Sequence, residues 1–127
     1  GAVHGFAGPL GGMFPAPHGS LCGILLPSVM EANIRSLIHG SGPAVALDRY
    51  TELARLLTGQ PDAEPAAGAV WVRSLVEAAG IPRLATWGIT ADDIPAIVKM
   101  ARQASSMKAN PVPLSDSELG GILAFVL

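Results

Sequence analysis

The sequence predicts an all-α protein of about six short helices, and two observations carry this prediction. Apolar residues recur at the spacing of three and four that places them on one helix face, and no stretch alternates apolar and polar residues as a half-buried strand does. Fifteen glycines and eleven prolines interrupt this pattern and divide it into short helices. Because 127 residues suffice for one core and not comfortably for two, we expect residues 1–127 to form a single domain.

The first two predicted helices differ in character. Residues 1–10 are small and apolar, and we expect the first helix to end at the following pair, Gly11 and Gly12. The second helix is predicted over residues 20–38, where apolar side chains surround the axis, so we expect deep burial. Pro27 lies in its middle and removes one backbone donor, which predicts a kink there.

Proline and glycine delimit the middle of the chain. Pro43 is suited to the first position of a third helix, and Gly59 stops that helix. Residues 60–68 form the only linker-like stretch and predict a loop. A fourth helix is predicted near residues 69–79, and Gly80 after it suits the left-handed position that ends many helices.

Two capping signatures predict the last two helices. Thr90 and Asp93 have the spacing of a capping box, so a fifth helix is expected to start near Thr90, or at Asp92 because Pro95 prefers a first turn. Ser115 and Glu118 have the same spacing ahead of an apolar run, which is the clearest helix start in the chain.

The charge content argues for a protein partner and against several other partners. Only 14% of the residues are charged, against a usual share of roughly a quarter, so we expect another domain or subunit, and a homo-oligomer in particular, to cover apolar surface. The net charge of -2 and the scattered Lys and Arg argue against nucleic acid. No apolar run approaches the roughly 18 residues of a membrane span, so no membrane association is expected.

The single cysteine and the N-terminal residues predict the cellular compartment and the relation of this chain to a larger protein. A single cysteine, Cys22, excludes an internal disulfide and fits a reducing, cytoplasmic environment. No basic region precedes an apolar stretch at the N-terminus, so no signal peptide is visible. The sequence starts at Gly1 and enters a patterned segment at once, from which we expect a piece of a larger protein.

Histidines are the main candidates for chemistry. His4 and His18 are separated by a Gly- and Pro-containing turn, so their imidazoles, which are common zinc and iron ligands, meet if the two helices pack tip to tip. The alternative for both is an ordinary, hydrogen-bonded histidine. His39 at a helix end is interpreted as a partner of the helix dipole, and Cys22 as a small core residue. No catalytic nucleophile or phosphate-binding loop is found.

At these histidines the chain resembles a known family. Residues 4–19 read HGFAGPLGGMFPAPHG, which is similar to the C-terminal signature of the iron-containing, metal-dependent alcohol dehydrogenases. The resemblance continues in order through ILLP at residues 24–27, VME at 29–31 with Asn33, GIPRL at 80–84, GI at 88–89 and NP at 110–111. It therefore covers nearly the whole chain.

The resemblance implies a fold and a metal site. Members of this family have an N-terminal α/β domain that binds the nicotinamide cofactor and a C-terminal all-helical domain that holds the metal. The chain is then the C-terminal part of a larger dehydrogenase, without the nucleotide-binding domain. The matching positions make His4 and His18 ligands of Fe(II) or Zn(II), which polarises an alcohol or carbonyl oxygen as hydride moves to or from NAD or NADP.

The sequence departs from the family pattern in two respects. Two further family ligands, an Asp and a His, come from a helix upstream of the matching segment and have no counterpart here. Many members also carry a second His four residues after the first, near the nicotinamide, and this chain has Gly8 there. With Gly8 at this position, the chain resembles a branch of the family that acts on other substrates, namely oxo acids such as maleylacetate.

These departures leave more than one function open. The resemblance implies an alcohol, aldehyde or oxo acid substrate, and Phe6, Gly8, Leu10 and Phe14 are candidates to line its cleft, with core packing as the alternative. We expect the chain alone to be inactive, because it lacks two ligands and the nucleotide domain. The other hypotheses are a non-catalytic helical assembly module and one half of a split enzyme.

Overall fold

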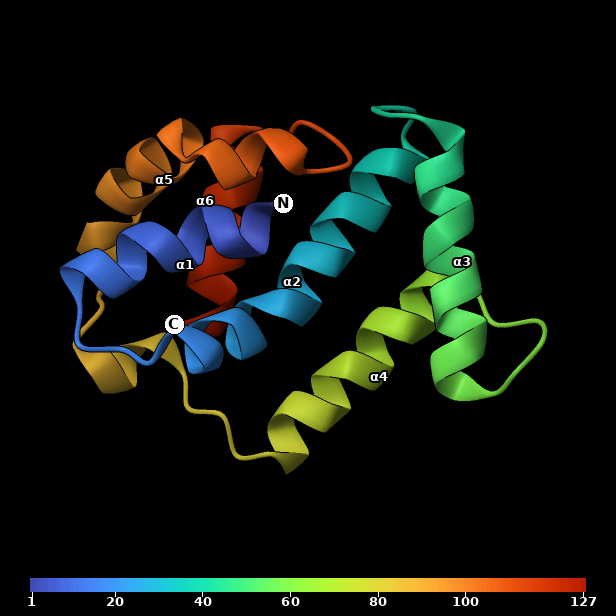
Figure 1. Ribbon diagram of the computed structural model, residues 1–127, viewed down its shortest axis with the longest axis horizontal. Helices are drawn as coiled ribbons and strands as arrows, with labels where there is room; N and C mark the ends of the chain where they lie inside the picture. The colour runs from blue at the N-terminus through green and yellow to red at the C-terminus, as the bar shows by residue number, and fades with distance from the viewer.

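The computed structural model describes all 127 residues and contains helices and no strands (Figure 1). Three short 3-10 helices, η1 (Leu84–Trp87), η2 (Ala91–Asp93) and η3 (Ser105–Ala109), lie in the C-terminal half. The all-α class and the number of main helices are confirmed. The six α-helices are α1 (Ala2–Met13), α2 (His18–Ile38), α3 (Ala44–Thr58), α4 (Pro65–Ala78), α5 (Ile94–Gln103) and α6 (Asp116–Val126).

Helix α2 is the centre of the fold, with α1, α5 and α6 toward one side of it and the α3–α4 pair on the other (Figure 1). Eleven of its 21 residues are buried, which confirms the deep burial predicted for this segment. The larger core joins α1, α2, α5 and α6, and a smaller one joins α2 and α4. Fully buried members of the larger core include Phe6, Leu10, Leu21, Leu25 and Leu123, and the smaller core consists of Met30, Ile34, Ala69, Val72 and Val76.

Helix α2 is also long and apolar enough to cross a membrane, judged by its length and its mean hydropathy of 1.3. Of its most apolar 18-residue window, however, 61% is buried among the other helices. Burial of this extent is the behaviour of a core helix, because a spanning helix presents its side chains to lipid.

The first helix extends further than the sequence predicts. We expected it to end at Gly11 and Gly12, and this was wrong, because α1 continues to Met13. The helix ends at Phe14, whose backbone is extended (φ -131°, ψ 151°). Phe14 precedes Pro15, and the ring of a proline disfavours the helical conformation in the residue before it. Pro15 therefore ends the helix, and Gly11 and Gly12 are part of its last turn.

The predicted loop at residues 60–68 was too long by four residues at its C-terminal end. Helix α4 begins at Pro65, whose fixed φ suits a first helical position. Gly68 lies inside α4 against α3, where an added Cβ would come within 3.1 Å of the Ala54 Cα. Gly68 thus permits a close approach of two helices, and its presence in the sequence was misinterpreted as a loop signal. Gly80 does occupy the left-handed conformation predicted for it, with φ of 64°, and Gly59, which was predicted to stop α3, has the same conformation with φ of 70°.

Both capping boxes are present. The Thr90 backbone N–H donates to Asp93 Oδ2 over 2.8 Å, although the turn that starts there is η2 and α5 begins only at Ile94. At α6 the Ser115 backbone N–H donates to Glu118 Oε2 over 2.7 Å, and the Glu118 N–H donates to Ser115 Oγ over 3.2 Å. The sequence therefore predicted the start of α6 correctly.

Replacing Ser115 by Ala is expected to lower the free energy of unfolding by about 1 kcal/mol, because the Glu118 N–H loses its acceptor. The effect should depend on pH. The hydrogen bonds from Ser115 hold the pKa of Glu118 below its ordinary value, and a carboxylate with a lowered folded-state pKa contributes stability above its unfolded pKa. That contribution is lost as the pH falls from about 4.3, the ordinary Glu value, through the lowered one.

Urea unfolding at neutral pH and at acidic pH measures both effects. The difference between the wild type and Ser115→Ala should shrink on acidification. Ser117→Ala is the matched control, because Ser117 is exposed in the same turn and its side chain makes no hydrogen bond. An equal loss of stability in Ser115→Ala at both pH values would contradict the role assigned to Glu118.

Candidate metal centre

The start of α2 lies beside α1, so that two histidines distant in sequence come together (Figure 1). After α1 the chain turns back through residues 14–17, and Pro17 in an extended conformation (φ -61°, ψ 130°) leads into His18 as the first residue of α2. The His4 and His18 rings have their centroids 5.5 Å apart and are tilted by 46°. They meet because α1 packs along α2, whereas the sequence suggested contact at the helix tips.

Cys22 is the third chemical group at this place. It follows His18 by one helical turn, and its Sγ lies 3.4 Å from His18 Nε2. One donor atom each from His4, His18 and Cys22 lies within 4.8 Å of the other two. Burial raises the pKa of the Cys22 thiol. Interpreting Cys22 only as a core residue missed this contact, although its spacing of four from His18 was the signal.

The donor set and its spacing fit a transition-metal ion. Imidazole nitrogen and thiolate sulfur are ligands that zinc, cobalt and iron accept. At metal–ligand distances of about 2.0–2.3 Å, two donors of a tetrahedral ion lie roughly 3.5 Å apart, so the 3.4 Å between Cys22 and His18 matches. His4 and His18 are both exposed, which leaves their rings free to rotate and close the remaining gap.

The face of α1 that carries His4 is largely bare backbone. Gly8, Gly11 and Gly12 are exposed, and a Cβ added at Gly8 or Gly12 would meet nothing within 4 Å. The side chains of α1 that fill the core point the other way: Phe6 and Leu10 are fully buried.

Phe14, at the end of α1, is half-buried. Of the four residues predicted to line a substrate cleft, Gly8 therefore lies on the surface that carries His4, whereas two belong to the core of this chain. Their role in a cleft stays a prediction.

A pair of amide side chains, Asn33 and Asn110, fixes the beginning of α1, two residues before His4. The Ala2 backbone N–H donates to Asn110 Oδ1 over 3.0 Å. Asn110 Nδ2 donates to Asn33 Oδ1 over 2.7 Å and to the Val112 carbonyl over 2.8 Å. The Asn33 amide also donates to the Tyr50 hydroxyl over 3.1 Å. These hydrogen bonds link the middle of α2 to the start of α1. Asn33 is only 2% exposed, so little water competes for its bonds.

The side chain of Met107 in η3 supports α1 from a second direction. A Cβ added at Gly5 would lie 2.8 Å from Met107 Cε, so η3 packs directly against the turn that carries His4. The backbone of His4 is thus held by packing on one side and by the Asn110 hydrogen bond at its start. A side chain on a backbone held in this way can keep a defined place for a ligand.

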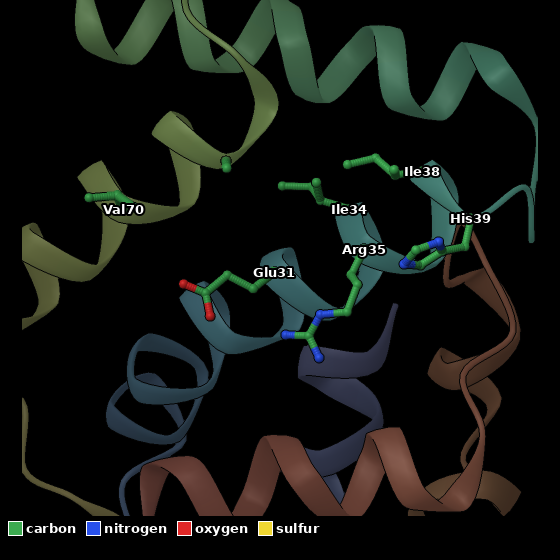
Figure 2. Close-up of a pocket in the computed structure, with 7 residues that line it drawn as sticks. Glu31, Ile34, Arg35, Ile38, His39 and Val70 are labelled. Carbon is green, nitrogen blue, oxygen red and sulfur yellow. The ribbon is translucent and has the colours of Figure 1, made fainter.

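A hollow lies far from the histidine pair. Figure 2 shows it between α2, which carries Glu31 and Arg35 and is followed by His39, and α4, which carries Val70. Its volume is about 340 Å³. The Glu31 carboxylate is already paired with Arg73 over 2.6 Å. His39 follows His18 by 21 residues, about 30 Å along a helix, so it cannot join the first cluster. It lies at the C-terminal cap position of α2, and its interaction with the helix dipole stays a prediction.

Comparisons with known proteins agree on the kind of protein. The family described as "Fe-containing alcohol dehydrogenase family, C-terminal" matches residues 1–126. Lactaldehyde reductase of Escherichia coli strain K12 is 34% identical over 117 residues, which cover 87% of this chain and 28% of that protein. The same holds for lactaldehyde reductase of Escherichia coli O157:H7.

Two solved structures share the fold over the whole chain. An alcohol dehydrogenase from Oenococcus oeni superposes with a TM-score of 0.81 at 26% identity, and a 1,3-propanediol oxidoreductase superposes with a TM-score of 0.78 at 24% identity. Each match covers 100% of this chain and 32% of the other. The chain therefore spans about a third or less of the length of the proteins it resembles.

Proposed function

The chain belongs to the Fe-containing alcohol dehydrogenase family, and we propose that it is the metal-binding helical part of an NAD- or NADP-linked alcohol dehydrogenase or carbonyl reductase. The observation that carries this proposal is the approach of the His4 and His18 rings, at 5.5 Å between centroids. The two residues stand at the positions that the family resemblance assigns to metal ligands. They converge although thirteen residues and a turn separate them.

In this proposal His4 and His18 hold the ion, and the bare face of α1 admits the reactants. A bound Fe(II) or Zn(II) would polarise an alcohol or carbonyl oxygen and stabilise the charge that develops on it. Gly8 stands one helical turn after His4 and has no side chain to obstruct an approaching substrate or nicotinamide ring. Gly8 also offers no group that carries a proton, so the proton follows a route that does not use this position.

The remaining parts come from outside residues 1–127. The nucleotide-binding domain and two further ligands, an Asp and a His, belong to the family pattern that precedes the matching segment. The substrate is an alcohol, aldehyde or oxo acid, and the names of the lactaldehyde and propanediol relatives favour small oxygenated alcohols and aldehydes. We place the protein in the cytoplasm and expect a homo-oligomer.

A second candidate function is assembly without catalysis, and the surface of the α3–α4 pair favours it. Large apolar side chains are exposed on these two helices. Exposed apolar surface of this kind often marks a site where a partner protein binds. Ile38 at the end of α2 adds to them and is 61% exposed. The exposed apolar residues of α3 and α4 are Val45, Leu53, Leu56, Val70, Trp71 and Leu75.

An activity assay with added partners separates these functions. The protein is assayed for nicotinamide-dependent reduction of small aldehydes with Fe(II) or Zn(II), alone and after mixing with the nucleotide-binding part of a relative. Metal-dependent activity supports the dehydrogenase, and activity only after mixing identifies a split enzyme. Metal binding without activity in any mixture would leave the assembly module.

Replacing Gly8 by Ala tests whether reactants approach this face of α1. Apart from its chain neighbours, the added methyl meets nothing within 4 Å, but the ring of Pro9 disfavours a helical residue with a Cβ before it, so the usual gain of about 0.5–1 kcal/mol from replacing a helical glycine should be reduced. In a catalytically complete enzyme, we expect the KM for substrate or nicotinamide to rise, because the methyl enters the space beside His4. Thermal unfolding and steady-state kinetics measure the two effects.

Gly121→Ala in α6 is the matched control, because Gly121 is also helical, exposed and without a neighbour within 4 Å. It should raise stability and leave the kinetics unchanged. Wild-type kinetics in Gly8→Ala would show that no reactant uses this face.

A further inference from the structure

Cys22 differs from the residues around it in its burial and in its neighbour. Leu21 and Leu25, on the same stretch of α2, are fully buried, whereas Cys22 is only half-buried. A cysteine that serves only to fill a core has apolar neighbours on all sides. Cys22 instead has its sulfur 3.4 Å from the Nε2 atom of His18, at the edge of the exposed cluster that also contains His4.

We propose that Cys22 is a third metal ligand, so that this chain provides an N, N, S site for zinc or cobalt. The proposal rests on the proposed function, because it takes His4 and His18 as the other two ligands. His18 and Cys22 stand four residues apart and therefore project from one face of α2, and His4 reaches the same place from α1. On binding, the thiol S–H bond breaks, a sulfur–metal bond forms and the proton passes to water.

The number and type of donors give the site a selectivity. Cysteine and histidine occur together as ligands in catalytic zinc sites, which keep a position open for substrate or water. Thiolate is a soft ligand and favours zinc over the harder oxygen-preferring ions. The positions that residues 1–127 leave open are available to a substrate oxygen, to water and to the Asp and His that the family pattern places upstream. Cys22 thus shifts the metal preference of this protein from iron toward zinc.

Cobalt(II) in place of zinc makes the proposed sulfur ligand visible. Cobalt bound to thiolate gives an intense near-ultraviolet charge-transfer absorption, whereas cobalt bound only to nitrogen and oxygen gives weak visible bands. Because Cys22 is the only cysteine in the chain, a charge-transfer band from the protein identifies it without ambiguity. We expect this band to rise with cobalt until one equivalent is bound, in protein kept under reducing conditions.

Three variants complete the experiment, each checked for its helical circular dichroism. Cys22→Ser should lose the charge-transfer band, keep the weak visible bands and bind zinc at least about 10-fold more weakly, since even the loss of an outer partner costs that much. His4→Ala should weaken cobalt binding. His39→Ala is the matched control and should bind like the wild type, because His39 lies at the far end of α2.

The outcomes separate this proposal from the proposed function. Cobalt bound without a charge-transfer band, or equal zinc affinity in Cys22→Ser and the wild type, would overturn the role of Cys22 and leave the histidine pair standing. No cobalt binding even at millimolar concentration would overturn both. The band in the wild type, its loss in Cys22→Ser and weaker binding in His4→Ala would support both.

Discussion

His4→Ala or His18→Ala is expected to reduce bound metal to background and, in a catalytically complete enzyme, to abolish the dehydrogenase activity. Each substitution removes a donor atom from a set that lies within 4.8 Å. The loss of affinity should exceed the roughly 10–100-fold caused by removing an outer-shell partner, because the histidines contact the ion itself. Elemental analysis of the purified protein, with zinc and iron quantified together, measures the result.

Stability provides the control for this prediction. Both histidines are exposed, so replacing them should change the free energy of unfolding by no more than about 0.5 kcal/mol. His39→Ala serves as the matched substitution at an exposed histidine outside the cluster. A fully loaded His18→Ala protein would contradict the assignment, and so would an equal loss of metal in His39→Ala.

Phe6→Ala is expected to have the largest effect on stability, a loss of about 3–5 kcal/mol in the free energy of unfolding. Phe6 is fully buried in the core that joins α1 to α2 and α5, and truncating it leaves a cavity that the packed helices cannot close. Because small domains are stable by only about 5–15 kcal/mol in total, the variant should be partly unfolded at physiological temperature.

Urea unfolding of Phe6→Ala against Phe125→Ala tests this. Phe125 is 55% exposed and lies under the Arg73 guanidinium at 4.5 Å, so its loss should cost no more than about 1 kcal/mol. If Phe6→Ala kept wild-type stability but lost substrate binding in a catalytically complete enzyme, Phe6 would belong to a substrate cleft, as one interpretation of the sequence held.

The parts of the fold that were predicted correctly depend on local signals. The box of Ser115 and Glu118 determines the start of α6 because both hydrogen bonds form within four residues. Gly59 and Gly80 end their helices because a left-handed turn favours glycine wherever the rest of the chain lies. Signals of this kind need no knowledge of tertiary contacts.

The errors arose where tertiary packing gives a residue its role. Gly68 resembles a loop residue until α3 is placed against it, with Ala54 within 3.1 Å of where a Cβ would stand. The faces of α1 could not be assigned either, since nearly every residue in the helix is small or apolar and no polar stripe marks the outside. The exposure of Gly8 and the burial of Phe6 became clear only from the packing.

The candidate site was predicted in part. The resemblance led to His4 and His18, and the fold brings their rings together. The contact of Cys22 with His18 was missed because the surroundings of Cys22 in sequence are apolar, and only the approach of its sulfur to His18 distinguishes it from a core residue. The roles of Asn33 and Asn110, which belong to the segments that resemble the family, are explained by the amide pair that holds the start of α1.

The central claim is that the start of α1 and the start of α2 bind one metal ion between them. Anomalous diffraction from crystals of the protein grown with Zn(II), recorded above and below the zinc absorption edge, tests it most directly. We predict a single strong anomalous peak within bonding distance of His4 and His18. A peak elsewhere, such as at His39, would contradict the account. So would the absence of a peak beside the two histidines in crystals of protein that is fully loaded with zinc.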